Sequence, residues 1–254
     1  MWLLIVFMLG GCLLLYSMLR EAFLNKVSKK DLFFPDFPAS FGQISIFFIS
    51  DIHRRVISDK VIADVIGKTD LVIIGGDLTE KGVPMKRVQK NIDKLKQLGP
   101  VYFVWGNNDY EVDFHALDVI LLESGVKILY NTSVTFESEI GEKICLLGVD
   151  DLNQKLDRLD FALMDAEVDS FKILASHYPQ ITEKVKPEHG IRLVLSGHTH
   201  GGQIHLLGYS PYEQGKIKIL KNTTVLISNG YGTTMLPLRL GAPAECHLLT
   251  LKKG

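Results

Sequence analysis

The stretch ISIFFISDIH, residues 44 to 53, contains the pattern from which the fold can be predicted. Its first seven residues, Ile44 to Ser50, form a nearly unbroken apolar and β-branched run of the length of one buried strand. The run ends at Asp51, and His53 follows two residues later. We therefore expect a buried strand that ends in a loop with a carboxylate and an imidazole, as a metal site with oxygen and nitrogen ligands requires.

Similar apolar runs recur along the chain and end in polar, Gly-rich or acidic loops, which is typical of the buried strands of a layered α/β fold. The predicted strands are Ile44 to Ser50, Leu71 to Gly75, Val101 to Trp105, Val126 to Tyr130, Ser133 to Glu137, Lys143 to Gly148, Phe171 to Ser176, Ile191 to Ser196, Thr223 to Ser228 and Glu245 to Leu251.

Helices are predicted at Lys60 to Ile66 and at Val83 to Leu98, where apolar residues recur at near-helical spacing. Strand and helix alternate early in the chain, whereas the later segments are mostly strands. The sequence therefore predicts an α/β fold, a layered α-β-β-α sandwich of two mixed sheets.

Further side chains suited to metals follow the next two strands. Gly75 and Gly76 lead into Asp77, where a carboxylate can bridge two cations. After the third strand come Gly106 and Asn107, and an amide oxygen is an acceptable ligand of a hard divalent ion. Each motif alone is also common as a structural turn.

Histidines follow two of the later strands. His177 comes directly after Ser176, and the stretch GHTHGGQ, residues 197 to 203, places His198 and His200 two residues apart in a glycine-rich loop. That spacing favours a common ion. Loops at one edge of an open α/β sheet meet in space, so we expect all of these side chains to gather there.

In this order the motifs Asp-x-His, Gly-Asp, Gly-Asn, His and Gly-His-x-His resemble the calcineurin-like metallophosphoesterase superfamily over about residues 44 to 254. The stretch NGYGTTMLP, residues 229 to 237, together with Arg239 and Pro243 to Glu245, resembles the bacterial membrane-associated phosphoesterase subgroup. That subgroup includes relatives of a diacylated glucosamine nucleotide pyrophosphatase. The resemblance therefore suggests a phosphorylated small-molecule or a lipid-linked substrate.

The resemblance also implies two divalent metal ions: manganese, iron, zinc or cobalt. By the family pattern one ion would be bound by Asp51, His53, Asp77 and His200, and the other by Asp77, Asn107, His177 and His198. Asp77 would bridge them. Two such ions lower the pKa of a shared water and stabilise in-line displacement at phosphorus, so no nucleophilic Ser or Cys is needed.

One position departs from the family. Many members have a histidine, paired with an acidic residue, where this chain has Asn108 followed by Asp109. We assign both residues to the catalytic group, although Asn108 cannot usefully donate a proton. The departure favours good leaving groups or an acid from elsewhere, for which His205 is a candidate beside its more ordinary structural role.

Other charged residues near the motifs have less defined roles. Arg54 and Arg55 are the predicted substrate contacts, and Arg239 is a further candidate, because guanidinium matches the geometry of phosphate oxygens. Asp150 and Asp151 follow a strand and either line the pocket or cap a loop. We predict structural roles for His115, His189 and His247.

The concentration of apolar residues at the N-terminal end of the chain indicates a membrane anchor. Trp2 to Leu19 has no charged residue and is just long enough to span a bilayer core of about 30 Å. Basic residues begin only after this run, which favours an uncleaved anchor over a signal peptide or a lipidated Cys12. The expected organisation is an anchor at 1 to 19, a juxtamembrane connector at 20 to 43 interrupted by prolines, and the catalytic domain at 44 to 254.

The predicted location is therefore the cell membrane, with a single span. The domain should face the cytoplasm, because Arg20, Lys26, Lys29 and Lys30 follow the span. Cys145 and Cys246 lie in apolar runs more typical of reduced core residues than of a disulfide framework, and a single disulfide between them is the alternative. With 28 basic and 29 acidic residues, the chain has no signature of nucleic-acid binding.

The leading functional hypothesis is a phosphodiesterase or pyrophosphatase at the membrane surface. The alternatives are a phosphomonoesterase or protein phosphatase, a non-catalytic metal-binding scaffold, and a purely structural metal site. The retained ligand motifs disfavour the scaffold, and an open loop edge disfavours a closed structural site.

Overall fold

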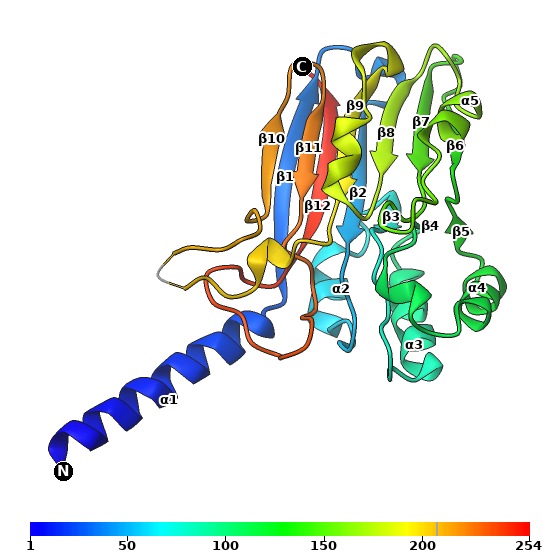
Figure 1. Ribbon diagram of the computed structural model, residues 1–254. Helices are drawn as coiled ribbons and strands as arrows, with labels where there is room; N and C mark the ends of the chain where they lie inside the picture. The colour runs from blue at the N-terminus through cyan, green and yellow to red at the C-terminus, as the bar shows by residue number, and fades with distance from the viewer. Residues whose placement is uncertain (207) are drawn as a thin grey trace.

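The computed structural model describes residues 1–206 and 208–254 and shows two six-stranded mixed sheets that pack against each other (Figure 1). The strand order is β1-β12-β2-β3-β4-β5 in the first sheet and β10-β11-β9-β8-β7-β6 in the second. The predicted fold class, a layered α/β sandwich preceded by an apolar helix, is confirmed.

The strands of the first sheet are β1 (Lys26–Phe34), β2 (Gln43–Ile49), β3 (Leu71–Ile74), β4 (Val101–Phe103), β5 (Lys127–Ile128) and β12 (Glu245–Lys253). Those of the second sheet are β6 (Thr132–Glu137), β7 (Lys143–Gly148), β8 (Phe171–Ala175), β9 (Ile191–Ser196), β10 (Lys216–Ile219) and β11 (Thr224–Ile227). The helices are α1 (Trp2–Ala22), α2 (Asp59–Val65), α3 (Met85–Leu95), α4 (Phe114–Glu123) and α5 (Leu159–Met164). Short 3₁₀ turns are η1 (Ala39–Phe41), η2 (Asn108–Tyr110), η3 (Pro179–Glu183), η4 (Pro187–His189) and η5 (His200–Gly202).

The central strands of each sheet run parallel, which brings their carboxyl ends to one edge. In the first sheet β2, β3, β4 and β5 are parallel, and β12 is antiparallel to β2. In the second sheet β7, β8, β9 and β11 are parallel, with β6 and β10 antiparallel at the two sides. The loops after β2, β3, β4, β8 and β9 therefore meet at one end of the sandwich.

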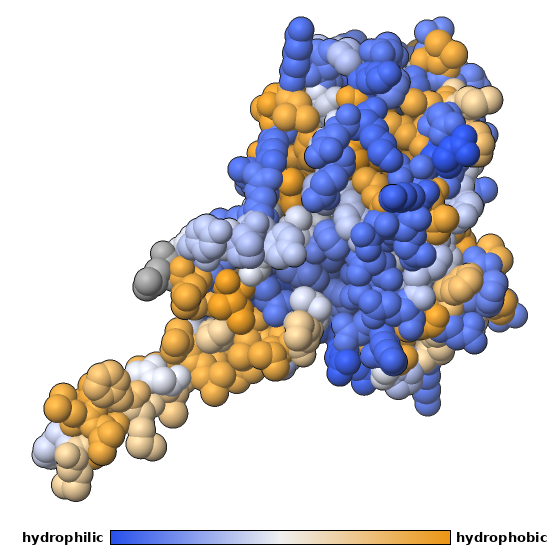
Figure 2. Space-filling view, viewed as in Figure 1, coloured by the Kyte–Doolittle hydropathy of each residue, from blue (hydrophilic) through white to orange (hydrophobic). Residues whose placement is uncertain are grey.

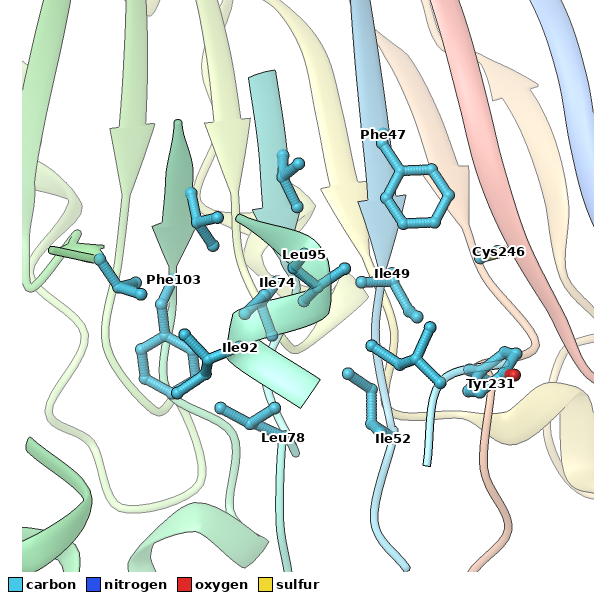
Figure 3. Close-up of a cluster of buried hydrophobic side chains, with 14 of the residues drawn as sticks. Phe47, Ile49, Ile52, Ile74, Leu78, Ile92, Leu95, Phe103, Tyr231 and Cys246 are labelled. Atoms are coloured by element: carbon cyan, nitrogen blue, oxygen red, sulfur yellow. The ribbon is translucent and has the colours of Figure 1, made fainter. Parts of the chain in front are cut away.

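Alternating side chains of the strands pack into separate core layers. Ile46 and Phe48 of β2 face the second sheet, where they join Leu195 of β9 in the central core. The next side chains along β2, Phe47 and Ile49, face the helices that cover the outer surface of the first sheet. Figure 3 shows this outer core, in which Ile92 and Leu95 of α3 pack over Ile74 and Phe103. A third core lies between the second sheet and α5.

The N-terminal helix α1 extends away from the sandwich, and its surface is apolar along most of its length (Figures 1 and 2). Only Ala22, its last residue, is buried. Among the described residues α1 is the one helix that is long and apolar enough to cross a membrane.

The segment from 20 to 43 differs from the predicted connector. It contains the nine-residue strand β1, which pairs in parallel with β12 from Lys26 to Phe34. The prolines at 35 and 38 follow the strand instead of interrupting it. The sheet domain therefore begins near residue 26, not at residue 44. The helices α4 and α5 and the strand β10 are further elements that the sequence patterns do not predict.

Candidate metal centre

Five loops bring the predicted ligands together. Asp51 and His53 follow β2, Asp77 follows β3, and Asn107 follows β4, all in the first sheet. From the second sheet, His177 follows β8, and the pair His198 and His200 follows β9. Because the strand ends share one edge of the sandwich, both sheets contribute to one cluster.

Five of these residues have a left-handed backbone. The φ angle is 54° at Asp51, 51° at His53, 51° at Asp77, 68° at His198 and 49° at His200. Such a conformation costs a non-glycine residue about 1–3 kcal/mol and persists mainly at functional sites. The strand-end loops thus retain strained residues at the positions that direct side chains into the cluster.

One group of candidate ligands comprises Asp51, His53 and His200. Their ligand atoms all lie within 4.8 Å of one another, and all three residues are buried. Nε2 of His53 is 3.1 Å from Nε2 of His200, and the latter is 3.4 Å from Oδ1 of Asp51. Two imidazole nitrogens and a carboxylate oxygen that converge in this way form a donor set suited to a divalent transition metal.

A second group comprises Asp51, Asp77 and His177. Their ligand atoms also lie within 4.8 Å of one another, and all three residues are buried. Oδ2 of Asp77 is 3.4 Å from Nε2 of His177 and 3.8 Å from Nε2 of His53. Asp77 therefore lies between the two groups, where the sequence places the bridging ligand. Asp51 also belongs to both groups, which the sequence pattern did not indicate.

The remaining two predicted ligands border the second group. Nδ1 of His198 is 3.2 Å from Nε2 of His177. The side-chain oxygen of Asn107 accepts a hydrogen bond of 3.0 Å from the Tyr178 hydroxyl, and an amide oxygen retains a second lone pair for another partner. Both residues line the cavity described below.

Burial and neighbouring charges shift the pKa values of the histidines in the cluster. Burial lowers the pKa of His177, but the Asp77 carboxylate outweighs burial and raises that pKa to about 10. Burial and the neighbouring His177 lower the pKa of His198 to about 4. Nδ1 of His177 is 2.8 Å from the Gly75 carbonyl, so it carries a proton and Nε2 faces Asp77. A cation at this point would replace the proton on Nε2.

Glu80 is a functional residue that the sequence pattern missed. One of its oxygens is 3.1 Å from Nδ1 of His53, and the other accepts a hydrogen bond from Arg54. A carboxylate on the far nitrogen of a metal-binding histidine fixes the orientation of the ring. No motif indicates Glu80, because its role depends on a contact between two loops.

The structure shows that Asp109 joins two ligand-bearing loops, and the catalytic role of Asp109 stays a prediction. Its side chain is fully buried and accepts hydrogen bonds from the backbone N–H groups of Asp77, Thr79 and Gly106. Its oxygens are therefore occupied in joining the loops after β3 and β4. Asn108 does face the cluster: its backbone N–H donates to Asp77, and its side-chain nitrogen is 3.3 Å from Nδ1 of His53.

The arginines predicted to contact substrate do not line the cavity. Arg55 lies over the ring of Tyr231 at 3.7 Å and donates to the carbonyls of Ala22 and Leu24, so it fastens the end of α1. Arg54 pairs with Glu80. Arg239 is fully buried and donates to backbone carbonyls, including those of His200 and Ala242. The sequence alone does not reveal these contacts, which give Arg54 and Arg55 partners within the protein, and their role as substrate contacts stays a prediction.

The other histidines lie outside the cluster. Nε2 of His205, the candidate for a replacement acid, is 2.7 Å from the Gly201 carbonyl and thus has a structural partner. His247 is buried beside Ser228, with 3.0 Å between Nε2 and the hydroxyl. Asp150 accepts a hydrogen bond from Tyr110 and does not line the cavity.

A cavity of about 440 Å³ opens above the cluster. One part of its wall is polar and includes Asp77, Asn108 and His200, whereas another part is apolar. The apolar part consists of Ile204, Tyr212, Met235 and Leu236. The cavity can thus accept a molecule that has both a phosphate-like group and an apolar portion.

The fold and this cluster define an α/β enzyme that acts with metal ions at the edge of a sheet. The chain belongs to the calcineurin-like phosphoesterase family, whose sequence profile matches residues 44–202. Membership supports a metal-dependent phosphoesterase that uses two metal ions, and it confirms the predicted family.

The chain is also similar to individual proteins. The Bacillus subtilis protein YpbG is 49% identical over 82% of this chain and 81% of its own length. A Danio rerio protein named "Transmembrane protein with metallophosphoesterase domain" is 28% identical over 95% of this chain, which matches 61% of that protein. A Helicobacter pylori metallophosphoesterase is 30% identical over 82% of this chain and 60% of its own length.

Solved structures share the fold. The NAD nucleotidase of Haemophilus influenzae superimposes with a TM-score of 0.52 at 17% identity, over 75% of this chain and 45% of that chain. The 5'-nucleotidase precursor of Thermus thermophilus also superimposes with a TM-score of 0.52. It is 12% identical, and the match covers 83% of this chain and 54% of that chain. The apolar helix α1 and the relatives named as transmembrane proteins support an association with the membrane.

Proposed function

We propose that this protein hydrolyses a phosphodiester or pyrophosphate bond at the membrane surface, with two divalent ions bound in the cluster. The observation that carries the proposal is the convergence of the Asp51 and Asp77 carboxylates with the four histidine rings at the floor of a cavity. A site of this kind binds a phosphate group through metal ions and needs no nucleophilic side chain.

The donor set fits two ions. Asp51, His53 and His200 would hold one, and Asp77, His177, His198 and Asn107 would hold the other, with Asp77 between them. Bound ions would supply an acidified water and neutralise charge on the phosphate. Mixed histidine and carboxylate ligands accept manganese, iron, zinc or cobalt.

Asn108 supports the proposal about which phosphate bond is hydrolysed. Its amide can donate a hydrogen bond to a phosphate oxygen but cannot protonate a leaving group. His205, which is hydrogen-bonded to Gly201, does not replace the missing acid. Without a general acid, a substrate with a stable leaving group reacts most readily, which favours an anhydride, or a diester with a stable leaving group, over an ester that expels an alkoxide.

The membrane location rests on α1. We propose that this helix crosses the bilayer once and that the domain lies on the cytoplasmic side, because Arg20, Lys26, Lys29 and Lys30 follow the apolar run. The name of the Danio rerio relative is consistent with a membrane-anchored metallophosphoesterase. A phosphorylated small molecule or a lipid-linked phosphate would be the substrate.

The test uses the full chain in detergent micelles, first stripped of metal and then supplied with Mn²⁺. We expect metal-dependent hydrolysis of bis(p-nitrophenyl) phosphate that exceeds hydrolysis of p-nitrophenyl phosphate and that is lost in Asp77→Asn. Asn108→His should raise the hydrolysis of an alkyl phosphodiester relative to that of bis(p-nitrophenyl) phosphate, because it restores an imidazole beside His53 that can protonate an alkoxide, whereas p-nitrophenolate leaves without a proton. If bound Mn²⁺ produces no diester cleavage, or if the monoester is preferred, the proposal is wrong.

A further inference from the structure

The mouth of the cavity carries exposed apolar side chains on two neighbouring segments. We call them the apolar rim, and they are Ile204, Leu206, Tyr209, Tyr212, Met235 and Leu236. Met235 is 93% exposed and Leu206 is 75% exposed. Contiguous exposed apolar residues beside a functional cavity indicate a surface that is covered by a partner or a membrane.

The rim has a fixed position relative to the cavity. Gln203 joins its two segments, because its side-chain nitrogen donates to the carbonyl of Thr234 at 3.0 Å and its side-chain oxygen accepts from the N–H of Thr234 at 2.9 Å. Ile204, Tyr212, Met235 and Leu236 also line the cavity. Any molecule that covers the rim therefore lies at the entrance to the metal centre.

The same part of the chain is bonded to the end of α1. The N–H of Arg239 donates to the carbonyl of Met18 at 3.1 Å, and the N–H of Gly241 donates to the Glu21 carboxylate at 2.8 Å. Arg55 adds its hydrogen bond to the Ala22 carbonyl. Figure 2 shows the apolar surface of α1 continuing onto the domain at the base of the helix.

A basic groove adjoins the rim. It is a hollow of about 800 Å³ that also includes Met235 of the rim. In it Lys94 pairs with Asp59, and Arg54 pairs with Glu80, so Arg55 and Lys90 supply its excess positive charge. Phe23, just beyond α1, lies in the same groove. Apolar and aromatic side chains flanked by lysine and arginine are typical of surfaces at the boundary between acyl chains and anionic headgroups.

The position of α1 in a bilayer determines where the rim lies relative to the membrane surface. A helix of 21 residues is about 31 Å long at a rise of about 1.5 Å per residue, close to the hydrocarbon thickness of a membrane. If α1 spans the bilayer, its C-terminal end lies at the surface. Hydrogen bonds at Met18 and Glu21 hold the Arg239 segment, and with it the rim, at that level.

We infer that the apolar rim is a second membrane contact, which rests among the lipid headgroups and opens the cavity toward the bilayer. The substrate is accordingly an amphiphile: its phosphate reaches the metal centre while its apolar part stays between the rim and the lipid. The part of this inference that concerns the substrate rests on the proposed function; the membrane contact does not.

The contact is tested by fluorescence quenching in vesicles of phosphatidylcholine and phosphatidylglycerol with brominated acyl chains. The full chain carries Trp2→Phe, so that the buried Trp105 is the constant background, and then Tyr209→Trp in the rim or Tyr130→Trp as the control. Tyr130 is 53% exposed and lies next to β5, at the side of the sandwich away from α1 (Figure 1). We expect strong quenching of the Tyr209→Trp chain and little quenching of the control. Equal quenching in the two chains overturns the membrane contact and leaves a protein or a second copy as the occupant of the rim.

The substrate is tested by the ratio of two hydrolysis rates, one for a diester with a long acyl chain embedded in the vesicles and one for a soluble diester. Replacing Leu206 and Tyr209 together by aspartate should lower this ratio at least about tenfold, since charges at these positions oppose insertion. Met164→Asp, at an 82% exposed apolar residue of α5, should leave the ratio unchanged. If neither diester is hydrolysed, the proposed function is rejected, and the quenching result still decides the membrane contact. Quenching with an unaltered ratio rejects the amphiphilic substrate.

Discussion

Among single residues, Asp109 has contacts that its place in the sequence does not indicate. The motif places it next to Asn108, yet its carboxylate is turned away from the cavity and accepts hydrogen bonds from three backbone N–H groups of the loops that carry the ligands. Burial and the nearby Asp77 raise the pKa of Asp109 to about 7. Its position in the sequence shows that it is close to the site but does not show which way its side chain points.

We predict that Asp109→Ala lowers both the free energy of unfolding and the affinity for Mn²⁺. The substitution leaves buried N–H groups without acceptors, and we expect a loss of about 2–4 kcal/mol. Urea denaturation of the metal-free chain and a metal titration measure the two effects. Asp169→Ala, at an exposed aspartate, is the matched control. A loss of turnover with unchanged stability and metal affinity would instead support a catalytic Asp109.

The protonation of His177 leads to a prediction about pH. Because its pKa is raised to about 10, the ring is protonated at neutral pH in the metal-free protein, and an ion must displace that proton. The pKa of His53 is also raised, since the Glu80 and Asp77 carboxylates outweigh its burial. The apparent metal affinity should therefore increase as pH rises from about 6 toward about 9, with release of about one or two protons.

Calorimetric titration with Mn²⁺ in buffers of different ionisation enthalpy measures this release. The observed binding enthalpy should vary with the buffer, and the slope gives the number of protons. His115→Gln, at an exposed histidine, should show the same slope as the unaltered chain. An enthalpy that is identical in all buffers would contradict the prediction.

Among the elements, the buried parallel strands could be predicted and the edge strands could not. The strand β2 is an apolar run because both of its faces are covered. In contrast, β1 reads KVSKKDLFF, is largely exposed, and depends on its pairing with β12. The strand β10, KIKI, is likewise short, charged and at an edge. Whether such a segment forms a strand depends on its pairing with a distant strand, which the local sequence does not encode.

The same distinction applies to the site. The seven predicted ligands gather because each follows a strand, and the order of strands brings their ends together. Glu80 and Arg239 act through contacts with loops far away in the sequence, on His53 and on the His200 backbone. Their roles therefore required the assembled structure.

The position of β1 predicts how the chain tolerates truncation. Removal of residues 1 to 24 should leave a folded domain, whereas removal of residues 1 to 43 should cause aggregation. The longer deletion exposes the edge of β12 and removes Phe34 and Phe37, which pack on Phe171. Burial of the two rings alone contributes about 3–6 kcal/mol. Size-exclusion chromatography and urea denaturation compare the two chains, and equal behaviour would show that β1 is dispensable.

At the scale of the whole molecule, the metal centre connects the two sheets. Asp51, His53, Asp77 and Asn107 belong to the first sheet, and His177, His198 and His200 belong to the second. In the metal-free protein, their carboxylates and rings are crowded at the end of the sandwich, and burial of these charges opposes folding. Ions that bind across the two sheets should stabilise the sandwich as a unit and not one loop at a time.

We therefore predict a single cooperative thermal transition that moves to higher temperature when Mn²⁺ replaces a chelator. An ion at about 100 times its dissociation constant adds about 2.7 kcal/mol per site, which corresponds to about 5–10 °C for a chain of this size. Differential scanning calorimetry of the full chain in micelles measures the shift. Asp77→Ala should abolish most of it, because Asp77 lies between both groups of ligands, whereas Asp169→Ala should retain it. A shift confined to part of the unfolding transition would mean that the sheets unfold separately and that the ions do not join them.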